Sequence, residues 1–450
     1  MAFRRTARRR VLAAASVGLA IGLALTGCSS SSGSGSGGGS ATQADIDAAL
    51  HKKTTISFWS WAPQAGELAK AFEKQYPDIT VKVSNVGGSD VEYTKLQNAV
   101  KAGSGVPDVA YMEYLAMPQF ALQKSLTDLS KYGQSGLSSQ FPASTWSQVA
   151  LDGGVYGVPM DSGPLVLYYR ADVFKKYGLK VPATWAEYTA DAQKLHQADA
   201  SKYITADAGD GNGTAAMIWQ AGGKPFSSSG SKLSVDLADA GSTAYAGMWG
   251  GLLSKGLIDS KTAQWSNEWL TGMADGTYAT WVAGAWGGSA LETHVPKASG
   301  DWRVAPIPQY TAGRSDSSQS GGSGLVVPSG SKNKLAAAGF VRWMTTSAAA
   351  NKIWVQAGQV PALNSTLTSA GWLGDKSAYF GGQQVNQVYA QASAHAPAGW
   401  QYLPFEPYAN SVYSDTVGQA FAGRTSLKNG LAAWQKKIVS YAKAQGFSVD

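Results

Sequence analysis

The chain has 450 residues and a formal net charge of +7, from 37 Lys and Arg against 30 Asp and Glu. Five arginines lie within the first ten residues, so about +2 remains without them, and a strongly basic nucleic-acid-binding surface is excluded. Cys28 is the only cysteine, which excludes an internal disulfide, and the length exceeds one comfortable hydrophobic core and predicts two lobes.

Residues 1–27 are typical of a secretory signal peptide, with an arginine-rich head, an apolar run from Val11 to Leu25 and a small-residue end. The run is too short to span a bilayer core of about 30 Å. Residues 25–28, Leu-Thr-Gly-Cys, resemble the bacterial lipobox, in which the cysteine is lipidated and the chain is cut just before it. We therefore expect Cys28 to carry a lipid. The alternative is an ordinary signal with an incidental cysteine, and the arginines leave Sec or twin-arginine export open.

Residues 28–44 follow as a tether, because Ser and Gly dominate them and supply no side chain for a core. A flexible chain of this kind has a mean reach of roughly 20 Å over its Ser/Gly stretch. The folded part is thus expected to stay close to a membrane surface.

Next comes an alternation of strands and helices. Strands are predicted at residues 55–59, 79–83 and 107–111, and helices at 65–76 and from Ser89, where Ser89 and Glu92 form a capping-box pattern. This β-α-β-α-β order predicts a mainly parallel sheet with helices on both faces.

The pattern continues towards the C-terminus. A buried strand is predicted at residues 166–169, a short helix at 172–177, and a longer helix that Thr184 and Glu187 cap. Residues 205–232 are rich in Gly, Asp and Ser and predict loops with short helices. The last helix carries Leu427, Leu431, Trp434, Ile438 and Tyr441 on one face, as expected for a helix docked on a core.

Several motifs in this order resemble the extracellular solute-binding proteins, family 1, of carbohydrate ABC importers, the maltodextrin-binding-like group. They are Phe58-Trp59-Ser60-Trp61, Gly105-Val106-Pro107-Asp108, Tyr156-Gly157-Val158-Pro159 before Leu167-Tyr168-Tyr169-Arg170, Pro182 to Glu187, and Gly276 to Trp286. The resemblance runs from about residue 54 to the end of the chain.

The resemblance implies an α/β, two-lobe periplasmic-binding-protein fold of the type II, Venus-flytrap kind. Residues 45–160 and 303–347 are expected to form the N-terminal lobe, and residues 161–302 and 348–450 the C-terminal lobe. The crossings are expected near residues 161–162, 302–303 and 345–351. A solute would bind between the lobes, which close by hinge motion, and a monomeric receptor on the outer membrane face of a Gram-positive, actinobacterial-type cell would deliver it to an ABC permease.

A sugar ligand needs aromatic rings for its C–H faces and planar polar groups for its hydroxyls. The resemblance and the loop positions together select candidates, each with a core or helix-start role as its alternative. The aromatic candidates are Trp59, Trp61, Trp219, Trp286 and Trp400, the polar candidates are Glu113, Asp161, Glu406 and Asn410, and Gly322 and Ser323 offer backbone groups. Trp286 ends a motif whose tryptophan stacks on sugar in relatives. Trp281 is expected to be core.

Other functions stay open at this point. A secreted glycoside hydrolase would use Glu113 and Asp161 as its carboxylate pair, and a binding protein for glycerol phosphate or a polyamine would use the same fold. No nucleophile elbow, phosphate-binding loop or His-rich metal motif is present, so no catalytic role, cofactor or metal is expected. The sequence does not select a particular sugar or linkage.

Overall fold

The computed structural model describes residues 40–450. The predicted signal peptide (residues 1–27) and the lipidation of Cys28 therefore lie outside the described residues. Across residues 40–450, no helix has both the length and the apolar composition required to cross a membrane.

A five-stranded sheet organises the first part of the chain, in the order β2-β1-β3-β14-β6. Its strands are β1 (Thr54–Trp59), β2 (Ile79–Ser84), β3 (Val109–Glu113), β6 (Val158–Pro159) and β14 (Ser323–Val326). β1 pairs in parallel with β2 and β3, as predicted, whereas β14 runs antiparallel to both β3 and β6. Strand β3 is central, which explains why four of its five residues are buried.

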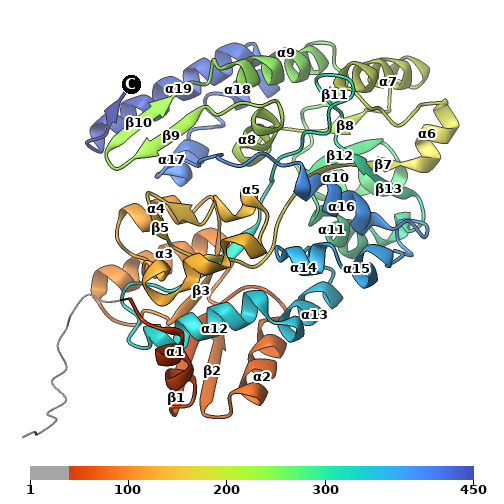
Figure 1. The fold of residues 1–450 in the computed structure, drawn as a ribbon. Coiled ribbons are helices and arrows are strands. Elements are labelled where there is room, and N and C mark those ends of the chain that lie inside the picture. Colours follow the sequence, from red (N-terminus) through yellow and green to blue (C-terminus); the bar gives the residue numbers. More distant parts are fainter. Residues whose placement is uncertain (1–39) are drawn as a thin grey trace, which may run out of the picture. The chain divides into compact units, whose positions relative to one another are not determined.

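Helices from residues 43–146 and from residues 334–356 pack around this sheet (Figure 1). They include α1 (Gln43–Leu50), α2 (Ala65–Gln75), α3 (Ser89–Ala102), α4 (Met117–Leu122), α5 (Ala143–Trp146), α12 (Lys334–Thr346) and α13 (Ala348–Gln356), with 3-10 turns η1 (Leu129–Tyr132) and η2 (Gln134–Gln140) and the hairpin of β4 (Ala150–Leu151) and β5 (Gly154–Val155). Phe340 of α12 meets Phe58 and Phe72 edge-on, with ring centroids 5.4 and 4.8 Å apart. These aromatic contacts fix α12 against the sheet.

A second sheet has the order β12-β7-β13, with both pairs antiparallel. Its strands are β7 (Leu165–Arg170), β12 (Thr280–Gly284) and β13 (Trp302–Pro306). Two smaller sheets flank it: a pair of β8 (Thr205–Ala206) and β11 (Ile258–Asp259), and a three-stranded sheet of β15 (Ser448–Val449), β10 (Lys232–Val235) and β9 (Phe226–Ser229). Tyr168 and Trp302 are fully buried around this sheet. The two sheets give the two lobes of the predicted fold class.

The remaining helices surround the second sheet and its flanking strands. They are α6 (Ala171–Tyr177), α7 (Trp185–Ala198), α8 (Gly211–Gln220), α9 (Ala240–Ser254), α10 (Asn267–Asp275), α11 (Gly287–His294), η3 (Pro296–Ala298), α14 (Asn364–Leu367), α15 (Ala370–Gly374), α16 (Val385–Ala394), α17 (Glu406–Ser411), α18 (Gly418–Phe421) and α19 (Leu427–Ala444). In α19 the predicted stripe buries Leu427, Leu431, Trp434 and Ile438.

The lobe boundaries stay a prediction. Residues 303–306 lie in β13, which pairs with β7, and this favours placing them with the second sheet. Helix α13 (348–356) contacts α2 and α12, which favours placing it with the first sheet. Both observations suggest crossings slightly later in the chain than the motif positions imply.

The two predicted capping boxes differ in outcome. At α7, Thr184 Oγ1 accepts from the Glu187 N–H at 3.2 Å, and Glu187 accepts from the Thr184 N–H at 3.1 Å, so this box is confirmed. At α3 the prediction is wrong, because Gly88 is the N-cap and Ser89 is already helical. The Glu92 carboxyl is buried without a hydrogen-bond partner, and this burial raises its pKa to about 8.

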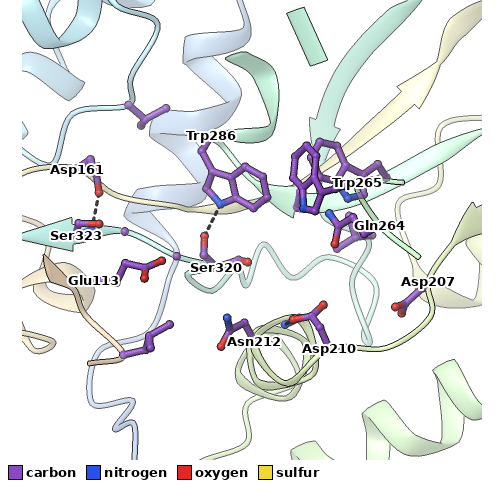
Figure 2. Close-up of a pocket in the computed structure, with 18 of the residues that line it drawn as sticks. Glu113, Asp161, Asp207, Asp210, Asn212, Gln264, Trp265, Trp286, Ser320 and Ser323 are labelled. Carbon is purple, nitrogen blue, oxygen red and sulfur yellow. Dashed lines mark hydrogen bonds between the residues drawn. The ribbon is translucent and has the colours of Figure 1, made fainter. Parts of the chain in front are cut away.

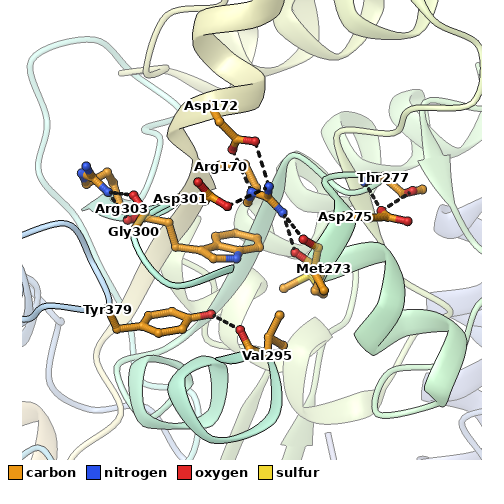
Figure 3. A network of polar contacts seen from close by, with 12 residues as sticks. Arg170, Asp172, Met273, Asp275, Thr277, Val295, Gly300, Asp301, Arg303 and Tyr379 are labelled. Carbon is orange, nitrogen blue, oxygen red and sulfur yellow. Dashed lines mark hydrogen bonds and ion pairs between the residues drawn. The ribbon is translucent and has the colours of Figure 1, made fainter. Parts of the chain in front are cut away.

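Arg170, the last residue of β7, ties several elements of the second sheet together (Figure 3). Its Nη1 donates to the Met273 and Ala274 carbonyls at 2.9 Å, and its Nε and Nη2 donate to Asp172 at 2.8 Å. Nη2 also lies 3.3 Å from Asp301. The arginine side chain is 4% exposed, so every one of these bonds replaces a lost water contact.

We expect Arg170→Ala to lower the free energy of unfolding by about 3 kcal/mol, because two carbonyls lose their donors in the interior. Urea unfolding followed by circular dichroism measures the change. Arg314→Ala is the matched control, since Arg314 is 62% exposed and its only ion pair within residues 40–450 is with Asp316. The control should leave the midpoint nearly unchanged. Equal losses in both variants would contradict a structural role for Arg170.

Candidate functional site

A cavity of about 660 Å³ lies where the two sheets meet. Residues of β3, β14 and the segment after β6 form one side of it, and residues of β12 and of the loops before α8 and α10 form the other. The volume falls within the range of about 300–1,000 Å³ that is usual for small-molecule sites. Figure 2 shows the labelled side chains of both sides pointing into the same space.

Strand pairing places Glu113 on the first side, because Glu113 of β3 lies directly opposite Ser323 of β14. The Tyr93 hydroxyl donates to Glu113 Oε2 at 3.0 Å and accepts from the Glu113 N–H at 2.9 Å. Tyr93 therefore fixes both the backbone and the carboxylate of Glu113. Burial raises the pKa of Glu113, and the bond from Tyr93 opposes this rise.

Asp161 lies beside Glu113 and holds β14 in place. Its Oδ1 accepts from the Ser323 N–H at 2.6 Å, and its Oδ2 accepts from the Tyr111 hydroxyl. Burial is the main cause that raises the pKa of Asp161 to about 7, although both hydrogen bonds lower it. Asp161 thus has a structural role in addition to lining the cavity.

The segment 320–322 passes along the cavity as bare backbone. Gly321 and Gly322 have φ angles of 80° and 99°, which other residues adopt only with strain. A Cβ on Gly322 would also lie 2.7 Å from the Tyr114 ring. The carbonyl of Ser320 accepts from Trp286 Nε1 at 2.8 Å, which orients the Trp286 ring.

Three tryptophans line the other side of the cavity, namely Trp265, Trp281 and Trp286. Trp281 and Trp286 meet edge-on at 5.5 Å, and Trp265 lies 5.8 and 6.1 Å from them. Trp281 is 4% exposed, as its predicted core role requires. Trp265 is 46% exposed and has a φ of 70°, a strained conformation for a large side chain.

The far end of the cavity is polar. Asp210 caps α8 by accepting from the Gly213 N–H at 2.7 Å, and Asp207 accepts from the Gly209 N–H and from Trp249 Nε1, both at 2.8 Å. Burial raises the pKa of Asp207 to about 6. Asn212 and Gln264 add amide groups at this end (Figure 2).

All the charged residues that line the cavity are acidic. Its four carboxylates belong to Glu113, Asp161, Asp207 and Asp210, and none of its residues is Lys, Arg or His. Among residues 40–450, no group of three or more His, Cys, Asp or Glu side chains has the arrangement of a metal site. The cavity therefore offers hydrogen-bond acceptors and aromatic faces and no cationic partner for an anion.

The structure brings five of the predicted ligand residues to the cavity: Glu113, Asp161, Trp286, Gly322 and Ser323. Trp59 and Trp61 are half-buried and do not line it, but the Trp61 ring meets the ring of the lining residue Tyr111 at 4.8 Å. Asn410 also lies outside it, 3.4 Å from the lining residue Asn212.

Trp219, Trp400 and Glu406 are core residues, which corrects their predicted place at the ligand. The rings of Trp219 and Trp400 stack at 5.2 Å and 8°, and both side chains are at most 2% exposed. Trp219 lies near the end of α8, where all residues from Thr214 to Gln220 are buried. Glu406 is 1% exposed, with Oε2 accepting from the Leu403 N–H at 3.0 Å.

Sequence reasoning missed several lining residues, chiefly Asp207, Asp210, Asn212, Gln264 and Trp265. The run Asp-Ala-Gly-Asp-Gly-Asn at 207–212 carried a usable signal, because acids among glycines follow a short strand and precede a helix. Trp265 carried none, since its strained backbone is visible only in the structure.

We expect Glu406→Gln to stabilise the protein at high pH. Burial raises the pKa of Glu406 from 4.5 to about 7, so the folded state retains a proton that the unfolded state loses between these values. The free energy of unfolding therefore falls by about 3 kcal/mol in all as the pH rises from 4.5 to about 7. The variant's advantage in thermal midpoint should grow from pH 5 to pH 8. The exposed Glu292→Gln serves as control, and a pH-independent difference for Glu406→Gln would contradict the buried titration.

Comparisons with known proteins agree with this geometry. A solved binding protein associated with an ABC transporter of B. animalis subsp. lactis Bl-04, in complex with beta-1,6-galactobiose, is 38% identical, with a TM-score of 0.77, over 89% of this chain and 100% of that one. The lactose-binding protein of Rhizobium radiobacter is 26% identical over 76% of this chain and 83% of its own length. The arabinooligosaccharide-binding protein of Bacillus subtilis (strain 168) is 25% identical over 73% and 77%.

Residues 59–351, more than half of the chain, match the family described as bacterial extracellular solute-binding protein. The match includes β3, β14 and most of the cavity lining. The chain therefore belongs to the bacterial extracellular solute-binding proteins, which act outside the cytoplasm and are binding proteins, not enzymes.

Proposed function

We propose that this protein is the sugar receptor of an ABC importer and that it binds a neutral di- or oligosaccharide in the cavity. The observation that carries the proposal is the lining itself, in which the rings of Trp265 and Trp286 face carboxylates and amides across one space. The similar proteins named above bind lactose, arabinooligosaccharides or galactobiose, which supports a saccharide ligand.

The proposed contacts divide by chemistry. Trp286 and Trp265 would stack on the apolar faces of two sugar rings. The exposed ring of Trp265, which is held by a strained backbone, would cover the outer sugar ring. Glu113 at one end and Asp207 with Asn212 at the other would accept and donate hydrogen bonds to hydroxyls. Backbone at Gly322 would approach closely because no Cβ intervenes.

The acidic character of the cavity lining distinguishes a neutral sugar from other candidate solutes. A glycerol phosphate would need Arg, Lys or a free helix N-terminus, and the lining has no basic residue while Asp210 caps α8. A cationic polyamine fits the four carboxylates and is the second candidate. Its binding would weaken steeply with salt, because screening acts on charge pairs, whereas the affinity for a neutral sugar would hardly change.

Delivery and anchoring are part of the same proposal. The lobes would close over the ligand by hinge motion, and an ABC permease would recognise the closed receptor. A lipid on Cys28 would hold the monomeric receptor beside that permease and raise its effective concentration. The predicted lobe crossings would provide the hinge.

Calorimetry of the purified protein tests the ligand class. We expect a Kd of roughly 1 μM, about −8 kcal/mol, for at least one of cellobiose, xylobiose, maltose, lactose and β-1,6-galactobiose, with little change between low and high salt. Spermidine and glycerol 3-phosphate are the comparison ligands. Binding of spermidine alone, or of no saccharide at all, would refute the sugar assignment.

Trp286→Ala should weaken binding of the tightest saccharide by about 2 kcal/mol, or roughly 30-fold, because the ring both stacks and is oriented by Ser320. Trp146→Ala is the matched control, since Trp146 is half-buried and lies outside the cavity. The control should keep full affinity. Unchanged affinity in a folded Trp286→Ala protein would remove this residue from the site.

Cys28→Ser should release the protein from the membrane fraction while leaving its saccharide affinity intact, because the change removes only the thiol that would carry the lipid. Fractionation of cells followed by immunoblotting measures the release. A variant that stays with the membrane after signal cleavage would contradict lipid anchoring.

A further inference from the structure

A small chamber of about 60 Å³ adjoins the end of the cavity at Asp207 and Gln264. The two spaces share eight lining residues, so the chamber is a continuation of the cavity and not a separate void. Its other walls come from residues that do not line the main cavity, among them Leu165, Thr214, Met217, Tyr245 and Trp249. Figure 2 shows Asp207 at the opposite end of the cavity from Glu113 and Asp161.

We propose that this chamber receives the exocyclic hydroxymethyl group of a hexose unit, and that the receptor thereby selects hexose saccharides over their pentose counterparts. The inference rests on the proposed sugar-binding function and names the substrate class of that same site. A hydroxymethyl group is one methylene and one hydroxyl, and the chamber offers a partner to each.

The size of the chamber suits a group of two heavy atoms. One water-sized group needs roughly 10–15 Å³ of such space, so about 60 Å³ admits a hydroxymethyl group with room for a water. A whole sugar ring does not fit there. The sugar ring would stay in the main cavity. Trp281 and Val282 line both the main cavity and the chamber, so they mark where the two spaces join.

Asp207 supplies the acceptor for the hydroxyl. Each of its oxygens takes one donor, from Gly209 N–H and from Trp249 Nε1, and a carboxylate has about four acceptor positions, so two stay open. Deeper in the chamber the Thr214 hydroxyl lies 2.7 Å from the Tyr413 hydroxyl and 3.3 Å from that of Tyr245. These hydroxyls can rotate to donate or accept.

The remaining wall is apolar and suits the methylene. Leu165 and Met217 are buried side chains at the chamber, and Val282 adds a further apolar side chain to its lining. A pentose would leave this wall and the Asp207 acceptor facing water or a void. A carboxylate at the same position of the sugar would meet the Asp207 carboxylate, so uronic acids are disfavoured too.

The relatives bind both kinds of sugar, since one is named for lactose and another for arabinooligosaccharides. Family membership therefore does not decide between hexose and pentose, and the shape of this chain's own site has to do so.

Calorimetry with matched ligands tests the proposal. We first find the tightest-binding hexose disaccharide among cellobiose, lactose, maltose and β-1,6-galactobiose. It is then compared with analogues in which one free hydroxymethyl group at a time is replaced by hydrogen. For cellobiose, xylobiose is the analogue in which both hydroxymethyl groups are replaced. One analogue should lose about ten- to fiftyfold in affinity, from a buried methylene and one hydrogen bond. Analogues all within twofold of the parent, or xylobiose or an arabinobiose as the tightest ligand, would overturn the proposal while leaving sugar binding intact. Absence of any saccharide binding would instead refute the proposed function and this inference with it.

A substitution series at Thr214 locates the group in the chamber. Thr214 is 2% exposed and lines the chamber but not the main cavity, so its side chain can contact the ligand only in the chamber. Thr214→Ile replaces the hydroxyl with an ethyl group, which enlarges the side chain by one heavy atom, and should bring the ratio of hexose to pentose-analogue affinity down at least fivefold. Thr214→Ser, which keeps the hydroxyl, should preserve the ratio. Thr214→Val, which replaces the hydroxyl with a methyl group of similar size, should lower the ratio about threefold and is the variant to use if Thr214→Ile does not fold. Thermal midpoints check folding, and an unchanged ratio in a folded Ile or Val variant would overturn the proposal.

Discussion

The antiparallel pairing of β14 with β3 is the constraint on which the rest of the site depends. It joins residues that are about 200 positions apart and sets Ser323 opposite Glu113. Asp161 completes this arrangement, because its carboxylate accepts from the Ser323 N–H and its segment leads from β6 towards the second sheet. One carboxyl group thus holds the strand pair, while the adjacent backbone at Gly321 and Gly322 passes along the cavity.

The opposite side of the cavity is built differently, from the loops before α8 and α10. Asp210 ends its loop by capping α8, and Asp207 is held by Trp249, so both acids have structural partners as well as open acceptor positions. Burial raises the pKa values of Asp161 and Asp207 to about 7 and 6, which reflects the cost of keeping acids in a cavity without a cation. Such a cost is expected where acceptors are needed for a ligand.

The sequence predicted the elements better than it predicted which faces of them are buried. Alternation and capping signals located β1, β2, β7 and α19, and the Thr184 box begins α7 as expected. The same signal failed at Ser89, because the Glu92 side chain turns into the interior and does not reach back to the cap. Both segments have a hydroxyl residue followed three positions later by a glutamate, so the local sequence pattern is the same. The two outcomes differ because the two glutamates pack differently against the rest of the protein.

By itself, the sequence determined the α/β class, the family resemblance and the candidate residues Glu113, Asp161, Trp286, Gly322 and Ser323, because strand ends, glycine pairs and motif positions are local properties. Only the tertiary structure decided that Trp219 and Trp400 stack on each other in the core and that Trp265 faces the cavity. A tryptophan buries a large area wherever an apolar neighbour is available, and whether that neighbour is another side chain or a ligand depends on contacts between distant segments. In this chain those contacts join residue 219 to residue 400 and residue 265 to residues 281 and 286.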